Sequence, residues 1–277
     1  MRHATTGTLA MHSSLITAMM LGAFALATLP SSVLARQADH TAHDQSAAEL
    51  IARAVAAPDR AQVNRRLDEG RKPAEVLAWS GIAPGMAVAD VMPGLGYWTE
   101  MMADIVGPTG SVAALQPQQF YNDDLATRHW QALLERSPEA SRLRYPFDRF
   151  AYSPESLDLA LINNSYHDLY WTSEQYSIPV TDPEVFVAGL YAAMRPGGRV
   201  VVIDHAAAGG EPRATVDALH RIDRAVVVAD FERAGFVLVD ESQLLANPDD
   251  DHTLSVFDEA IANHTDRFML KFQRPAA

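Results

Sequence analysis

The sequence predicts an α/β protein with a mostly parallel sheet and helices on both faces. Strand-like and helix-like segments alternate through most of the 277 residues. The apolar runs 157–162 and 200–203 are nearly uninterrupted, as expected for strands covered on both faces. A turn containing Gly94 and Gly96 joins a strand-like segment to a helix-like one, which is a typical ligand-binding element of such folds.

The first 35 residues have the pattern of a cleaved secretory signal. With histidine neutral, Arg2 is the only charged residue before Arg36, residues 15–29 are apolar, and Pro30 interrupts them. An uncleaved membrane anchor is the alternative, but a span needs roughly 20 apolar residues. We therefore expect an exported, periplasmic protein.

The chain after the signal is predicted to form an arm and one domain. Residues 36–72 are expected to be a flexible tether followed by an N-terminal helical arm, and residues 73–277 to be the domain. The predicted strands of the domain are 86–92, 111–115, a weak extended piece at 144–148, 157–162, 200–203, 236–240 and 267–272. The predicted helices are 73–79, 100–106, 123–135, one starting at Asp182-Pro183, and a long helical region at 213–234.

Composition limits the possible partners. The formal net charge is −13 at pH 7, so an acidic surface would repel nucleic acid and anionic lipid, and neither is expected as a partner. There is no cysteine, which excludes disulfides and thiolate zinc sites. The remaining expectation is a small-molecule substrate.

The glycine turn has the residues that a nucleotide-type ligand requires. Gly94 and Gly96 let the backbone approach a ligand, the following helix start offers free N–H groups, and Asp90 at the strand end can accept hydrogen bonds. Similar turns also occur for packing reasons alone.

Titratable side chains follow two predicted strands at the edge where ligands bind. Residues 163–168 (Asn-Asn-Ser-Tyr-His-Asp) follow one strand, and Asp204-His205 follows the other. A single histidine there could be a packing residue, but two His and two Asp indicate a functional site. The run Asp249–His252 is interpreted as a solvated loop, with a divalent metal site as the alternative. His129 and His220 are expected to be surface or packing residues.

Several segments together resemble class I S-adenosylmethionine-dependent methyltransferases. The segments are residues 88–97, 110–112, 157–161 and 194–204, within a resemblance that covers about residues 70–273. The chain looks closest to an exported, poorly characterised branch that carries Asn-x-x-Tyr-His-Asp and Ala-Gly-Phe segments, here 163–168 and 234–236. The resemblance implies a Rossmann-like, mostly parallel sheet with an antiparallel final strand.

The resemblance also implies a cofactor site. S-adenosylmethionine would be the cofactor, and Asn163 would lie beside its transferable methyl. The residues assigned to the cofactor are Asp90, Gly94, Gly96, Tyr97, Gln116 and Asn163. Two positions depart from the family pattern: Met92 stands where the family has glycine, and Gln116 stands where an acidic residue would hold the ribose hydroxyls. A neutral amide gives up charge-assisted hydrogen bonds.

The leading hypothesis is methyl transfer to a small acceptor. His167, oriented by Asp168 or Asp204, is the expected base, and Tyr166 and His205 are expected to line the acceptor pocket. One alternative is a non-enzymatic small-molecule-binding protein, suggested by Met92 and Gln116. The other is a metal-assisted hydrolase, although no metal is assigned; its candidate residues are His167, Asp168, Asp204, His205 and His252.

Overall fold

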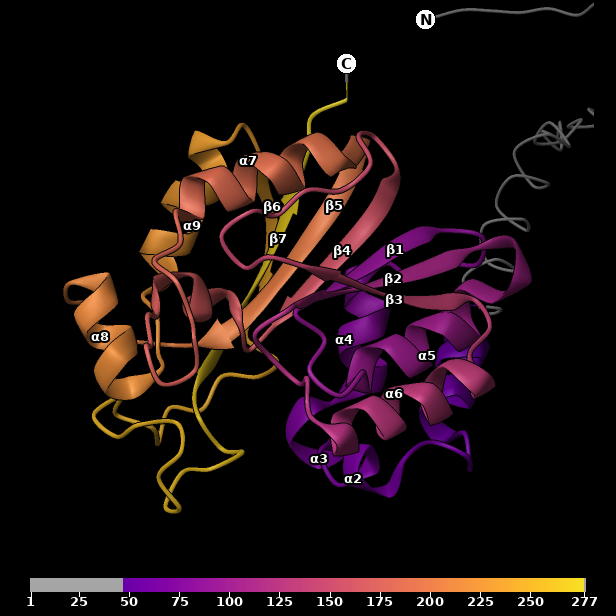
Figure 1. Cartoon of the computed structure of the whole chain (residues 1–277), viewed down its shortest axis with the longest axis horizontal. Coiled ribbons are helices and arrows are strands. Elements are labelled where there is room, and N and C mark those ends of the chain that lie inside the picture. The colour runs from indigo at the N-terminus through magenta and orange to yellow at the C-terminus, as the bar shows by residue number, and fades with distance from the viewer. Residues whose placement is uncertain (1–46, 277) are drawn as a thin grey trace, which may run out of the picture. The chain divides into compact units, whose positions relative to one another are not determined.

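The predicted α/β fold is confirmed in a computed structural model that describes residues 47–276. A seven-stranded sheet has the order β3-β2-β1-β4-β5-β7-β6, and only β7 runs antiparallel to its neighbours β5 and β6 (Figure 1). The predicted signal, 1–35, and the predicted tether at 36–45 lie outside the described residues.

The strands and helices follow the predicted order along the chain. The strands are β1 (Ala87–Val91), β2 (Ser111–Pro117), β3 (Ala140–Tyr145), β4 (Leu157–Asn163), β5 (Met194–His205), β6 (Val237–Ser242) and β7 (Arg267–Gln273). The helices are residues 47–56, α2 (Gln62–Arg65), α3 (Asp68–Arg71), α4 (Pro73–Ser80), α5 (Tyr97–Val106), α6 (Asp124–Arg136), α7 (Pro183–Ala193), α8 (Pro212–Leu219) and α9 (Arg224–Arg233). Short 3₁₀ segments occupy η1 (Gly107–Thr109) and η2 (Tyr166–Tyr170).

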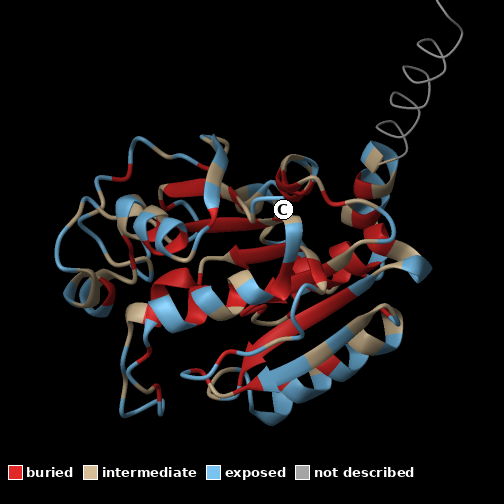
Figure 2. Ribbon diagram, turned by 90° about the horizontal axis from the view of Figure 1, so that it is seen from above, coloured by how far each residue is buried: buried red, intermediate tan, exposed pale blue. Residues whose placement is uncertain are grey.

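Each face of the sheet has its own hydrophobic core. Helix 47–56, α4 and α5 pack on one face, where Trp98 and Met101 meet the strands. Helices α7 and α9 pack on the other face through side chains such as Leu190 and Phe231. Buried residues therefore lie in the central strands, and exposed residues lie on the outer helices and edge segments (Figure 2).

Two predicted elements differ from the structure. The extended piece expected at 144–148 is β3 at 140–145, an edge strand whose exposed residues leave little apolar pattern in the sequence. The single helical region expected at 213–234 is two helices. His220 has a left-handed backbone (φ 51°) that ends α8, and Asp223 caps α9 by accepting a hydrogen bond from Ala225 N.

The strand order identifies the edge of the sheet at which a ligand is expected to bind. β1 lies between β2 and β4, where the direction of sheet growth reverses, and ligands of open α/β sheets bind outside the strands' carboxyl ends at that point. Residues 47–72 belong to the same compact unit as the sheet, and Ile51 lies in its core. Within residues 47–276, no helix has both the length and the apolar composition that a membrane crossing requires.

Candidate functional site

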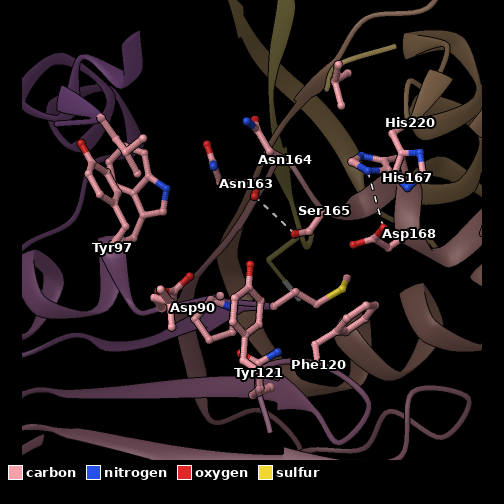
Figure 3. Close-up of a pocket in the computed structure, with 18 of the residues that line it drawn as sticks. Asp90, Tyr97, Phe120, Tyr121, Asn163, Asn164, Ser165, His167, Asp168 and His220 are labelled. Carbon is pink, nitrogen blue, oxygen red and sulfur yellow. Dashed lines mark hydrogen bonds and ion pairs between the residues drawn. The ribbon is translucent and has the colours of Figure 1, made fainter. Parts of the chain in front are cut away.

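A cavity of about 610 Å³ lies at this edge of the sheet. Most of the predicted site residues line it, namely Asp90, Gly94, Tyr97, Gln116, Asn163, His167, Asp168 and His205. Asp90 and Tyr97 lie toward one end, His167 and His220 lie at the other, and Asn164 lies between them (Figure 3). We call these ends the turn half and the histidine half.

The glycine turn is held by both its backbone and the helix behind it. Gly94 and Gly96 have positive φ (59° and 77°), and Gly96 caps α5. A Cβ at Gly96 would lie 2.5 Å from a Leu133 methyl carbon, so this glycine packs against α6 and does not line the cavity. From α6, Trp130 Nε1 donates to Gly94 O (3.1 Å), and the His129 ring contacts Leu95 O (2.8 Å) through Nε2. His129 is thus a packing residue, as predicted.

Met92 occupies a position that favours glycine. Its φ is 55°, in the left-handed region that costs a residue with a side chain roughly 1–2 kcal/mol. Its side chain is buried and lines the cavity beside the turn. The departure seen in the sequence therefore has two structural consequences: local backbone strain, and a thioether where the family pattern leaves space.

Asp90 is a buried carboxyl group at the end of β1. Its Oδ2 accepts a hydrogen bond from Thr99 Oγ1 (2.6 Å), which ties the strand end to α5. Burial raises the pKa of Asp90 to about 7, against the opposing effects of Thr99 and Arg71. Near neutral pH this group can therefore both accept and donate hydrogen bonds.

Several polar atoms that line the cavity have no partner within the described residues. They are Gln116 Oε1, Asn163 Oδ1, Asn164 Oδ1 and Trp98 Nε1. A buried polar atom without a hydrogen bond costs about 1–3 kcal/mol, so such a group indicates a ligand or water. Together they offer hydrogen-bond acceptors and one donor to a polar ligand.

His167 and Asp204 form the central pair of the histidine half. His167 Nδ1 lies 2.7 Å from Asp204 Oδ1, and the backbone N–H of His167 donates to Asp204 Oδ2 (2.8 Å). His167 Nε2 lies 3.6 Å from Asp168 Oδ1. The sequence left open which aspartate orients His167; the structure assigns that contact to Asp204. The second ring nitrogen faces Asp168.

The two aspartates control the charge of His167. Burial lowers the pKa of its ring, but the attraction of Asp204 and then Asp168 outweighs this, and the pKa rises to about 9. Burial would raise the pKa of Asp204, yet His167 holds it below its ordinary value. Burial raises the pKa of Asp168 to about 6. At neutral pH the three groups are therefore one imidazolium and two carboxylates.

Two further histidines flank this pair and stay neutral. His205 Nδ1 contacts Thr265 Oγ1 (2.7 Å), and burial lowers its pKa to about 3. The His220 ring packs on His167 with 5.7 Å between ring centroids, and burial lowers its pKa to about 4. His220 was expected to be a surface or packing residue in a helix, but it ends α8 and lines the cavity. The break between α8 and α9 turns His220 toward the cavity, and no helix-ending residue in the sequence marks that break.

The N-terminal arm supplies cavity residues that sequence reasoning missed. Asn64, Leu67 and Arg71 line the turn half, and the Arg71 guanidinium lies over the Tyr97 ring, 4.4 Å from its centroid. These residues precede the predicted domain at 73–277, and no local pattern marks them as ligand-facing.

Tyr166 does not line the cavity, contrary to the prediction. It is fully buried, and its hydroxyl donates to Asp230 Oδ2 (2.7 Å) in the core. The reason is the 3₁₀ turn η2, in which adjacent residues face different directions, so that His167 faces the cavity and Tyr166 faces α9.

Of the residues of the metal-site alternative, His167, Asp168, Asp204 and His205 lie together, and His252 lies apart. His252 Nε2 contacts Asp266 Oδ2 (2.9 Å) and does not line the cavity. Among residues 47–276, no group of three His, Asp or Glu side chains has a metal-binding arrangement. The histidine half is therefore described by its ion pair.

Comparison with solved structures gives the fold class. The chain is similar to an S-adenosylmethionine-dependent methyltransferase from Aquifex aeolicus (16% identity, TM-score 0.50), covering 72% of this chain and 88% of that one. It is similar to the [4+2]-cyclase SpnF (13%, TM-score 0.52; 77% and 81% covered). It is also similar to phosphoethanolamine N-methyltransferase 2 from Haemonchus contortus (13%, TM-score 0.51; 74% of this chain and 52% of that one covered).

No family model matches the chain, and no curated protein matches it. The strand order and the antiparallel β7 are those of the class I methyltransferase fold. Identities this low establish the fold and leave the reaction to the chemistry of the site.

Proposed function

We propose that the protein is an S-adenosylmethionine-dependent methyltransferase that acts on a small acceptor. One observation carries the proposal: a single cavity at the ligand-binding edge of a class I methyltransferase fold joins the glycine turn to the His167–Asp204 pair. The first element suits a nucleoside cofactor and the second suits proton transfer from an acceptor.

The hydrogen-bonding groups of the turn half fit the cofactor. Gly94 lets the backbone come close, and Gln116 Oε1 and Asn163 Oδ1 are acceptors without partners among the described residues. Hydroxyl and amino groups of an adenosyl ligand would satisfy such acceptors. When bound, S-adenosylmethionine supplies an electrophilic methyl group; the residues of the chain hold and orient the reactants.

In the histidine half, His167 would take a proton from an acceptor that must lose one. Asp204 orients the ring through Nδ1, and Nε2, which lies 3.6 Å from Asp168 Oδ1, is the nitrogen that would meet the acceptor. Because the pKa of His167 is raised to about 9, the neutral, basic form becomes more abundant as the pH rises toward that value. We therefore expect the rate of such a reaction to increase between about pH 7 and pH 9.

Calorimetry tests the cofactor assignment. S-adenosylmethionine and S-adenosylhomocysteine are titrated into the purified protein, and saturable binding of both is expected. Gly94→Val is the variant that should bind less, because Gly94 lines the cavity with a positive φ (59°) and a side chain there would lie in the turn. Absence of binding at millimolar cofactor would sink the proposal.

We also propose that the protein works outside the cytoplasm, on the basis of the signal pattern in residues 1–35. Expression in a bacterial host, followed by fractionation and mass measurement of the purified chain, tests this. A periplasmic product that begins near residue 36 is expected. A cytoplasmic product of full mass would contradict it.

A small-molecule-binding protein without methyl transfer is the second candidate. Met92 favours it, because its backbone is strained and its side chain reduces the room for a cofactor in the turn. Native mass spectrometry distinguishes the two: an adenosyl ligand retained by the protein supports the transferase, and a different small molecule supports the binding protein.

A further inference from the structure

A second cavity, of about 310 Å³, adjoins the first and reaches both of its halves. The two cavities share the lining residues Leu67, Arg71, Asn164, His205, Val256 and Phe257. The second cavity is completed by Gly70, Ala262, Asn263, Thr265 and Arg267, which line it and not the larger one. It is therefore a side chamber of the same site, between the end of α3 and the start of β7.

The side chamber is cationic in an acidic protein. Arg71 and Arg267 line it, and no Asp or Glu is among its described lining residues. Within residues 47–276, neither guanidinium forms an ion pair; Asp90 and Asp68 act on Arg71, and Asp266 acts on Arg267, only from a longer distance. Two arginines therefore face one chamber with no carboxylate in direct contact.

Arg267 is built into the chamber wall. Its side chain is 7% exposed, its Nη2 donates to Gly70 O (2.6 Å), and its buried Nε has no partner within the described residues. Burial, followed by repulsion from Arg71, lowers the pKa of Arg267 to about 10. A bound anion would reverse both effects, since it would pair with the guanidinium and accept from a free N–H group.

We propose that the side chamber binds an anionic group, a carboxylate or a phosphate, of the acceptor molecule. This rests on the proposed function for the identity of the ligand as an acceptor. Arginine's planar fork matches both anions. His205 borders both cavities as a neutral ring, and Val256 and Phe257 give the passage an apolar wall. The acceptor would thus have its anion at Arg267 and its reacting end toward His167.

Binding of two simple probes tests the chamber directly. Inorganic phosphate and benzoate are titrated into the full protein without cofactor, with binding followed by calorimetry or ligand-observed NMR. Arg267→Met is expected to reduce the affinity for the tighter-binding probe at least tenfold, and Arg267→Lys to reduce it by less. Tighter binding of benzoate would identify a carboxylate, and tighter binding of phosphate a phosphate.

Arg199→Met is the matched control. Arg199 also donates to a glycine carbonyl at a helix end (Gly81 O, 3.1 Å), but it lines neither cavity. Its substitution should leave probe binding unchanged. Arg71→Gln, at the more accessible wall, provides a second test if Arg267→Met does not fold. Probe binding that is absent from the wild-type protein, or equal in all variants, would overturn the proposal.

A cofactor titration separates this proposal from the proposed function. Arg267→Met should bind S-adenosylmethionine as the wild type does, because Arg267 does not line the larger cavity. If the wild-type protein binds the anion probes but not S-adenosylmethionine, the proposed methyltransferase function is refuted and the anion site in the side chamber stands. If it binds S-adenosylmethionine but neither anion probe, the anion site is refuted and the proposed function stands.

Discussion

The two halves of the cavity are built in different ways. The turn half is centred on one short stretch, in which the end of β1, Gly94, Gly96 and the start of α5 follow one another, and the N-terminal arm adds side chains to it. The histidine half gathers His167, His205 and His220 from three separate segments. A local motif thus shapes one half through backbone conformation, and tertiary packing creates the other through a buried ion pair. The two halves should respond differently to substitution.

The largest effect is expected in the histidine half. His167→Gln should lower methyl transfer by roughly 10²–10⁴-fold, the usual contribution of a general base, while leaving cofactor affinity unchanged. Transfer of labelled methyl to an acceptor found by screening small molecules measures the rate. His252→Gln is the control, because His252 forms a similar pair with Asp266 outside the cavity. A pH-independent rate in the wild type would remove the role of His167 as base.

A substitution in the turn half should act on stability. Gly96→Ala combines a left-handed backbone with a Cβ that would lie 2.5 Å from Leu133 Cδ1. Strain of roughly 1–2 kcal/mol and overpacking of about 1–3 kcal/mol should both reduce the free energy of unfolding. Urea denaturation measures it. Gly197→Ala (φ 83°), where a Cβ would meet nothing within 4 Å, should show the backbone cost alone. Equal losses in the two variants would contradict the packing role of Gly96.

The ion pair of the histidine half should make stability depend on pH. His167 has a pKa raised to about 9 from an ordinary 6.5, so protonation favours the folded state. Its stabilisation is complete below about pH 6.5 and is lost as the pH rises through about 9. Urea denaturation of wild type and Asp204→Asn across this range measures it. The difference in the free energy of unfolding between wild type and Asp204→Asn should shrink as the pH rises. A difference that stays constant would rule out a charged pair between His167 and Asp204.

The smallest effect is expected from restoring a charge in the turn half. Gln116→Glu would place a carboxylate where the resemblance to class I methyltransferases implies an acidic residue, and under the proposed function a charge-assisted bond to a ribose hydroxyl should strengthen cofactor binding about tenfold. Calorimetry with S-adenosylmethionine measures the affinity. Unchanged or weaker binding would indicate that Gln116 does not face the ribose, although its Oε1 is buried at the cavity and unpaired among the described residues.

Much of the fold could be predicted because its signals are local. The apolar runs of β4 and β5 and the Asp182 cap of α7 occur where the sequence pattern placed them. The errors fall where local signals are weak. β3 is an exposed edge strand, and the break between α8 and α9 depends on the left-handed conformation of His220, a residue that does not mark a helix end by itself.

The sequence by itself determined the order of elements, the glycine turn and the edge of the sheet at which polar residues meet, because periodicity and turn chemistry act over a few residues. Only the tertiary structure decided that Asp204 pairs with His167, that Tyr166 faces the core, and that Arg267 faces a chamber with Arg71. These relations join residues far apart in the chain, and side-chain direction and burial, which fix them, exist only once the sheet and its helices have packed.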